Sequence, residues 1–219
     1  MNIRARPVLT YRWIVFLLAA GYCIYQVMFG HWTGPGGPFR YLTIWALFLS
    51  CYSASRMLAL SGGQSTRTHE VTATCAAVLN VMVVFLYWRL YLIDPALVNN
   101  GGQIVWWLEY YLHGLGPALQ IIDALFIGAV FHRVWRAIVP LILIIAAYVA
   151  WAEWFVQRFN DSPLGSVTSG LPYPFLNNME LAERSVFYAV NAGTAMGLLV
   201  VFGVVGAVLY RVMRPRVVA

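Results

Sequence analysis

Six stretches of the sequence are long and apolar enough to cross a lipid bilayer, and this feature constrains the fold more than any other. They cover roughly residues 13–29, 41–60, 71–93, 106–131, 137–156 and 185–210. A helix needs about 20 mainly apolar residues to span the hydrocarbon core. Charged residues make up only 10% of the chain, against roughly 25% in soluble domains. The sequence therefore predicts an all-α, polytopic membrane protein in which residues 1–219 form a single domain, a bundle of six transmembrane helices.

The distribution of arginine predicts how this bundle is oriented. Six spans place both termini on one side, together with ten arginines: Arg4, Arg6, Arg12, Arg56, Arg67, Arg133, Arg136, Arg211, Arg214 and Arg216. The opposite side has four: Arg40, Arg89, Arg158 and Arg184. Because positive residues concentrate on the cytoplasmic side, we expect cytoplasmic termini and insertion into the cell's inner membrane. Basic residues that flank spans indicate orientation rather than nucleic-acid binding.

The first apolar stretch follows three arginines, as a secretory signal would. It is too long for the core of a typical signal, and no A-x-A cleavage site follows it, so we expect a retained span. The cysteines Cys23, Cys51 and Cys75 fall within or at the edge of apolar stretches. We expect buried thiols there rather than disulfides.

The fourth stretch carries Glu109, His113, Gln120 and Asp123 inside an otherwise apolar run. Ionisable side chains at membrane depth are costly, which makes them candidate functional residues. Glu109 and His113 are four residues apart and share a helix face with Gln120. Asp123 lies about 15 Å farther along the helix than His113. At that depth we expect Asp123 to hydrogen-bond Asn80 and to stabilise helix packing.

The predicted topology brings further polar residues into the outer third of the bundle. This layer contains Thr43, Arg89, Glu109, His113, Glu153 and Asn191. A hydroxyl beside a histidine is the smallest nucleophile–base pair, because the imidazole takes the hydroxyl proton while the oxygen attacks an acyl carbon. Thr43 and His113 supply these groups. The plainer alternatives are a threonine bonded to its own backbone and a histidine that only packs.

The other members of this layer have supporting roles. Glu109, one turn before His113, is placed to orient the imidazole, and Asn191 to orient it or to contact an oxyanion. Arg89 either holds a substrate carboxylate or, as a simpler structural role, pairs with Glu109. Glu153 lies between two tryptophans, a position that favours a side chain reaching out to the membrane interface.

Three short motifs, in order along the chain, resemble one family of membrane proteins. They are Gly36-Gly37-Pro38-Phe39-Arg40-Tyr41-Leu42-Thr43-Ile44, then Leu112-His113-Gly114-Leu115-Gly116-Pro117 with Asp123, then Leu171-Pro172-Tyr173-Pro174-Phe175-Leu176-Asn177. Together they resemble the androgen-induced and androgen-dependent TFPI-regulating membrane proteins. The resemblance covers nearly the whole length of the chain.

This resemblance implies an intramembrane hydrolase of fatty acid esters of hydroxy fatty acids, with a threonine nucleophile, a histidine and no cofactor. Carried over, the threonine is Thr43 and the histidine is His113, acting first as base and then as acid. We expect the lipid ester to enter from the outer leaflet. The chain is shorter than the animal members and the residues after His113 differ, so we expect a prokaryotic relative acting on this or a similar ester.

The third motif predicts local structure of its own. Its two prolines lack amide donors and favour extended backbone. We expect the loop to dip into the outer interface, where it either roofs the site or only packs. Asn177 followed by Glu180 predicts a capping box at the start of the last long helix.

Two other functions stay open. A metal-dependent intramembrane hydrolase needs about three protein ligands, for which His31, Glu109 and Glu153 are the available helpers of His113. The other is a non-enzymatic transporter or binding protein for a lipid or small solute. We detect no internal repeat, which argues against a two-fold pseudosymmetric transporter.

Overall fold

The computed structural model describes residues 3–98, 105–160 and 170–213, and its regular structure over these ranges is entirely helical. The long helices are α1 (Arg6–Phe29), α2 (Leu42–Ser61), α3 (Glu70–Ile93), α6 (Ile138–Trp151) and α8 (Leu181–Met213). Shorter elements are η1 (Gly37–Arg40), η2 (Pro95–Leu97), α4 (Trp106–Tyr110), η3 (Tyr111–Leu115), α5 (Gly116–Ile122), η4 (Asp123–Ile127), η5 (Val130–Ala137), η6 (Ala152–Val156) and α7 (Pro174–Asn177).

Within the described ranges, five helices are long and apolar enough to cross a membrane. They are Arg6–Phe29, Leu42–Ser61, Glu70–Ile93, Val130–Val156 and Leu181–Leu209. Their lengths, 20 to 29 residues, match the thickness of a bilayer's hydrocarbon core. An all-α chain built from such helices is an integral multi-pass membrane protein.

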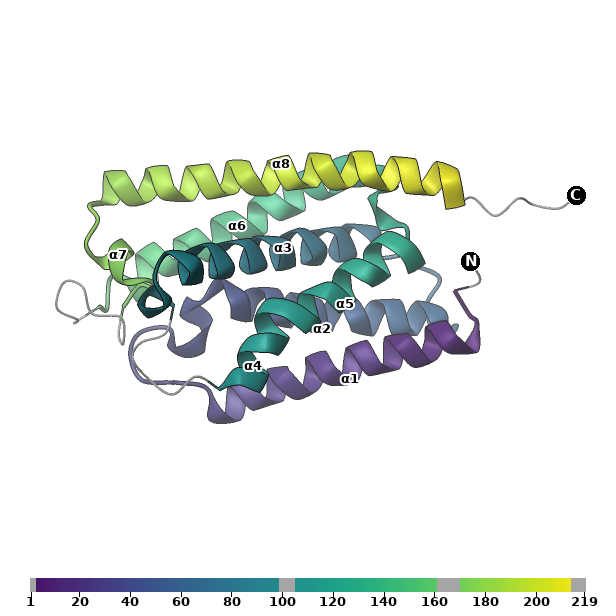
Figure 1. Ribbon diagram of the computed structural model, residues 1–219, viewed down its shortest axis with the longest axis horizontal. Coiled ribbons are helices and arrows are strands. Elements are labelled where there is room, and N and C mark those ends of the chain that lie inside the picture. Colours follow the sequence, from purple (N-terminus) through teal and green to yellow (C-terminus); the bar gives the residue numbers. More distant parts are fainter. Residues whose placement is uncertain (1–2, 99–104, 161–169, 214–219) are drawn as a thin grey trace, which may run out of the picture.

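The fourth predicted span is not one regular helix. It is divided into α4, η3, α5 and η4, where η3 and η4 are π-helical turns. His113, inside η3, has φ −114° and ψ 15°, outside the helical range. The pieces together still run from one end of the bundle to the other (Figure 1), and α5 packs against α1, α2 and α3.

Helix α3 forms the centre of the bundle, with α2, α5, α6 and α8 packed around it. Its residues Ala76, Ala77 and Val78 have no exposed surface. Small side chains such as these let neighbouring helices approach closely, which is how helices associate in lipid. The outer surfaces of α6 and α8 instead expose large apolar residues, among them Leu143 and Val204.

The structure corrects the predictions for Arg12 and Asp123. Arg12 does not flank the membrane as a free charge, because it is 1% exposed and its guanidinium binds both oxygens of Asp123 at 2.7 and 2.9 Å. It also donates to Met57 O and to Ser61 Oγ. Asn80 does not contact Asp123 and donates instead to Ser50 Oγ at 2.7 Å. A buried charge needs a partner of opposite charge. The apolar residues around Asp123 gave no sign that its partner would come from α1.

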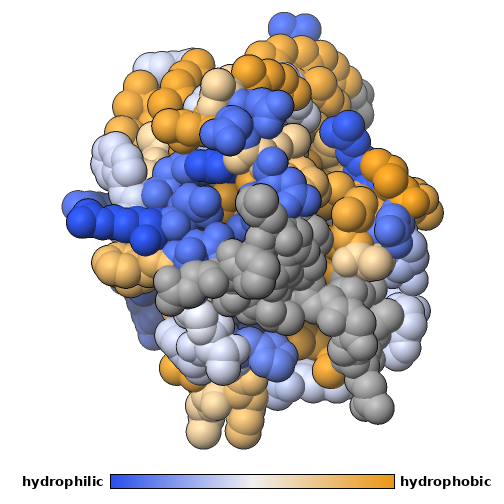
Figure 2. Space-filling model, turned by 90° about the vertical axis from the view of Figure 1, so that its left-hand side faces the viewer, coloured by the Kyte–Doolittle hydropathy of each residue, from blue (hydrophilic) through white to orange (hydrophobic). Residues whose placement is uncertain are grey.

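The start of α1 and the end of α8 lie at the same end of the bundle, on the right in Figure 1. The opposite end carries α4, α7 and the start of α2. Figure 2 shows this opposite end, where hydrophilic residues gather near the middle and are flanked by hydrophobic ones. A group of hydrophilic residues therefore lies at the end of the bundle opposite the start of α1 and the end of α8.

Candidate functional site

Thr43 and His113 meet at this polar end. The Thr43 Oγ1 atom lies 3.4 Å from the His113 Nε2 atom, although the residues are 70 positions apart in sequence. This is the long end of hydrogen-bonding distance, and catalytic hydrogen bonds are often long before a substrate binds. The expectation that the two side chains lie close together is met.

Two glycines set the position of Thr43. Gly36 and Gly37 have φ of 76° and 49°, which side chains other than glycine rarely adopt. A Cβ atom on Gly36 would lie 2.8 Å from Val156 Cγ2, and one on Gly37 would lie 2.8 Å from Trp32 Cε3. The turn leads through η1 into α2, and Thr43 is in the first turn of that helix. The glycine pair of the first motif is thus a requirement of this turn.

A break in the helix sets the position of His113. In a regular α-helix the amide of residue 117 would donate to the carbonyl of His113, but Pro117 has no N–H. Trp88 Nε1 donates to that carbonyl instead, at 2.9 Å. The same turn is π-helical over Tyr111–Leu115, and such turns are frequent at functional sites. The histidine-to-proline spacing of the second motif therefore encodes the break that aims the imidazole.

Two further side chains hold the ring of His113. The Tyr87 ring is stacked on it, with centroids 3.6 Å apart and planes at 7°. Glu109 Oε2 lies 3.0 Å from Nδ1, the ring nitrogen that does not face Thr43. The contact is within ion-pair distance, but neither atom meets the geometry of a hydrogen bond with any described residue. The arrangement Thr43–His113–Glu109 is that of a nucleophile, a base and an orienting carboxylate.

Trp88→Phe is expected to lower the free energy of unfolding by about 1–3 kcal/mol, because it leaves the carbonyl of His113 without its donor. The melting temperature of the purified protein in detergent measures this. Trp106→Phe is the control, since Trp106 is 49% exposed. Equal melting temperatures for the two variants would show that the indole contact does not support the break.

A cavity of about 300 Å³, here called the site cavity, adjoins the pair. Thr43, His113 and Glu109 line it, as do His31 and Tyr173. Its wall is completed by Tyr25, Gln26, Phe29, Gly30, Pro38, Tyr41, Ile44, Tyr87, Val98, Val105, Leu108, Leu112 and Pro172. Burial and the neighbouring Tyr41 raise the pKa of Tyr173 to about 12, so its hydroxyl stays neutral at physiological pH. The lining is mixed in polarity, as binding sites for amphipathic small molecules are.

The other predicted site residues are dispersed. Arg89 is exposed and does not pair with Glu109; its guanidinium lies over the Phe85 ring, 6.0 Å from the centroid. Gln120 is buried and donates to Ser50 O at 3.3 Å, and it lines a small space that Thr43 also lines. Asn191 lines a different cavity, treated below.

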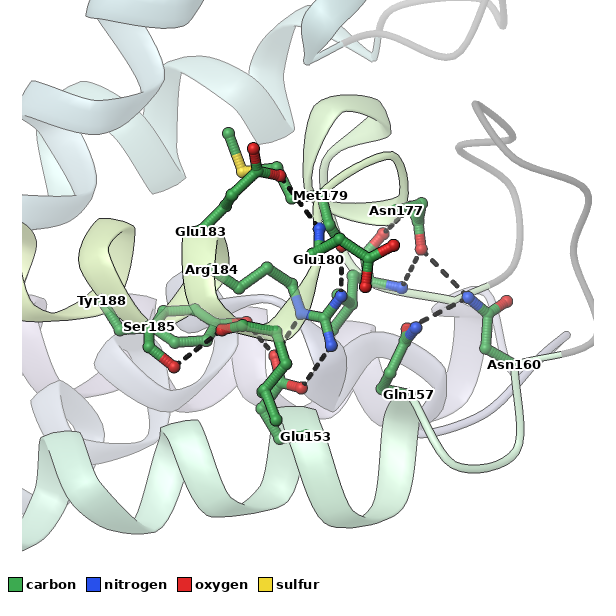
Figure 3. A network of polar contacts seen from close by, with 12 residues as sticks. Glu153, Gln157, Asn160, Asn177, Met179, Glu180, Glu183, Arg184, Ser185 and Tyr188 are labelled. Atoms are coloured by element: carbon green, nitrogen blue, oxygen red, sulfur yellow. Dashed lines mark hydrogen bonds and ion pairs between the residues drawn. The ribbon is translucent and has the colours of Figure 1, made fainter.

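Glu153 does not reach outward to the interface. Its carboxylate accepts hydrogen bonds from Arg184 at 2.8 and 2.9 Å and from the Tyr188 hydroxyl at 2.7 Å, as Figure 3 shows. Arg184 also donates to Met179 O. The prediction missed this because the partners lie on α8, 31 or more residues away. The network ties η6 to the start of α8.

Asn177 and Glu180 do not form a capping box together. The Asn177 side chain accepts from Leu171 N and donates to Leu171 O and Tyr173 O, so it closes the 171–177 segment on itself. The helix start is instead stabilised by Glu183, whose carboxylate accepts from Glu180 N at 3.0 Å. The E-x-x-E spacing gives half of a capping box three residues later than predicted.

Tyr87 and Trp88 are members of the site that the sequence patterns did not indicate. Pro117 was a usable signal for Trp88, because it leaves the carbonyl of His113 in need of a donor from elsewhere in the chain. Nothing local marks Tyr87, an ordinary aromatic residue in apolar surroundings. The loop of the third motif was expected either to roof the site or only to pack, and its Pro172 and Tyr173 line the site cavity. Among the described residues, no three of His, Cys, Asp and Glu gather closely enough to hold a metal ion.

The profile of the family described as FAR-17a/AIG1-like protein matches residues 9–207 of the chain. No curated protein and no solved structure matches the chain. The matched range contains all three motifs, and with them Thr43 and His113.

Proposed function

This chain belongs to the FAR-17a/AIG1-like family, whose members include hydrolases of fatty acid esters of hydroxy fatty acids, and from that premise we propose that it hydrolyses a lipid ester within the membrane. The contact between Thr43 Oγ1 and His113 Nε2, 3.4 Å at the wall of a cavity of about 300 Å³, carries the proposal. The substrate class is a fatty acid ester of a hydroxy fatty acid or a close analogue.

The proposal includes a topology. The five membrane-length helices and the broken α4–η4 segment form six crossings, with both termini in the cytoplasm. Arg12 is paired inside the bundle and does not count as a flanking charge. Nine arginines then lie on the side of the termini and four on the opposite side, so the positive-inside bias remains. The site cavity then opens near the outer leaflet, where a lipid ester reaches it without leaving the membrane.

The reaction proceeds in two acyl-transfer steps. His113 Nε2 accepts the Thr43 hydroxyl proton while Oγ1 attacks the ester carbonyl carbon, and the proton then passes to the departing alkoxide. The alcohol leaves and an acyl-threonine remains. Water, deprotonated by the same imidazole, attacks the acyl carbon, and Thr43 regains its proton as the fatty acid departs.

The position of Thr43 also favours the negative charge that develops on the carbonyl oxygen of the substrate. Backbone amides in the first turn of a helix have no intrahelical acceptors, and the helix dipole is positive there. Thr43 is the second residue of α2. Ile44 N already donates to Tyr41 O at 3.0 Å, so the oxyanion formed on the carbonyl attacked by Oγ1 is favoured by the positive end of the helix dipole rather than by the Ile44 amide.

Glu109→Gln is expected to lower kcat about tenfold or more, because the carboxylate beside Nδ1 holds the imidazole in the tautomer that leaves Nε2 free to accept a proton. Steady-state hydrolysis in lipid nanodiscs measures the effect. Glu180→Gln, at the exposed start of α8, is the matched control. An unchanged kcat in the Glu109 variant would show that the carboxylate has no part in the mechanism.

The function is tested by trapping the acyl-enzyme. Purified protein in nanodiscs is treated with a long-chain activated ester or a fluorophosphonate, and the adduct is located by peptide mass spectrometry. We expect one adduct, on Thr43, and its loss after His113→Gln. Hydrolysis with an adduct on another residue would contradict the assignment, and absence of both hydrolysis and adduct would contradict the function.

The same preparation decides between hydrolysis and the alternatives. Vesicle flux of a labelled lipid without ester cleavage would identify a transporter. Activity lost on chelation and restored by a divalent metal would identify a metal-dependent hydrolase.

A further inference from the structure

A second cavity, of about 60 Å³, lies beside the site cavity and is here called the inner cavity. Residues of α3, α6, α8 and the 171–177 segment form most of its lining. Pro172 and Tyr173 line both cavities, and on α2 Leu42 lines the inner cavity while the adjacent Thr43 lines the site cavity. The first turn of α2 and the Pro172–Tyr173 pair are therefore the partition between the two spaces.

The lining of the inner cavity is suited to hydrocarbon. Most of it is aliphatic or aromatic, including Leu79, Met82, Leu86, Ile145, Leu176 and Phe187. Three of its polar side chains are already engaged: the Tyr148 hydroxyl donates to Arg40 O, the Tyr188 hydroxyl to Glu153, and the Asn191 amide to Phe187 O. A polar ligand would lose its hydrogen bonds to water and find few hydrogen-bond partners in the cavity, whereas an alkyl chain makes no hydrogen bonds that it could lose.

The partition is held in place by the network of Figure 3. Arg184 binds Glu153 of η6 through two hydrogen bonds and Met179 O through a third. Asn177 closes the 171–177 segment through its contacts with Leu171 and Tyr173. The wall behind Thr43 is thus fixed by hydrogen bonds rather than by apolar packing alone.

We propose that the inner cavity binds a short unbranched alkyl chain, the hydrocarbon arm on one side of the ester held at Thr43; this rests on the proposed function. One water-sized group needs roughly 10–15 Å³ of such space, so the cavity accommodates about four to six groups of that size. The arm that fits is correspondingly short, about C4 to C6. The longer, more polar part of the substrate stays in the site cavity.

Filling the inner cavity tests the proposal. Ala192 lines it from α8, and Ala189, three residues earlier on the same helix, is exposed. In the wild type, kcat/KM should rise about fourfold for each methylene added between acetyl and hexanoyl esters. Ala192→Phe should abolish that rise, reducing hexanoyl hydrolysis by roughly two orders of magnitude and acetyl hydrolysis less than about twofold. Ala189→Phe should keep the wild-type profile.

A binding measurement separates this proposal from the hydrolase function. In Thr43→Ala, an alkyl ester with a terminal diazirine should crosslink to Leu79, Met82 or Ala195, in competition with a non-hydrolysable ether analogue. Such crosslinking without wild-type hydrolysis would retain the cavity assignment and reject the function. Hydrolysis with an unchanged chain-length profile in Ala192→Phe would retain the hydrolase function and reject the cavity assignment. A diazirine phospholipid that labels the cavity and is not displaced by the ether would make it a site for bilayer lipid and overturn the proposal.

Discussion

Replacing Thr43 with valine is expected to reduce kcat for ester hydrolysis by about 10⁴-fold or more, because valine keeps the branched shape and removes the attacking oxygen. Thr43→Ser should retain activity, since it keeps the hydroxyl. His113→Gln should match the loss seen in Thr43→Val. Steady-state kinetics with a hexanoyl ester in nanodiscs measures all three variants.

The double variant Thr43→Val/His113→Gln provides the sharper test. Residues that act as one unit give non-additive losses, so the double variant should be no worse than either single variant. Losses that multiply would show that the two side chains act independently. The melting temperature and the binding of the ether analogue serve as controls that each variant is folded.

Asp123→Asn is expected to destabilise the protein by about 3–5 kcal/mol, because it leaves the buried guanidinium of Arg12 without a counter-charge. Arg12 is 1% exposed and has both of its ionic contacts with this one carboxylate. Thermal or denaturant unfolding of the purified protein in detergent measures the loss. We expect no comparable loss in Arg89→Met, since Arg89 is exposed.

Removing both charges distinguishes a structural pair from a functional one. Arg12→Met/Asp123→Leu replaces the pair with apolar side chains of similar volume and should recover most of the stability. The site cavity is lined by neither residue, so the double variant should also hydrolyse the ester. A stable but inactive double variant would give this ion pair a part in the reaction and contradict its structural assignment.

Much of the fold follows from patterns that act over short distances. The apolar stretches gave the membrane-length helices, with ends within a few residues of those in the structure at α2 and α3, because burial in lipid requires a fixed length of apolar helix. The first motif overlaps the start of α2, and its two glycines have backbone angles and space that only glycine accepts. The second motif contained the reason for the break at His113, since proline removes a specific amide.

The polar layer predicted from depth is found only in part. Thr43 lies beside His113, because both enter from the same end of the bundle. Arg89, Glu153 and Asn191 do not line the site cavity, since depth gives a residue's position along the membrane normal and not its direction around the helix. Glu153 pairs with Arg184, whereas Arg89 is exposed and its guanidinium lies over the Phe85 ring.

By itself, the sequence determined the helix lengths, the turn before Thr43, the break at His113 and the family of the chain, all of which depend on residue type and local spacing. The tertiary structure alone decided the pairing of Arg12 with Asp123, the stacking of Tyr87 on His113 and the partition formed by Pro172 and Tyr173. These contacts depend on how each helix is rotated about its axis and which helices are neighbours. Rotation and neighbours are set by the packing of small residues along α3, a property of the whole bundle that no single stretch of sequence carries.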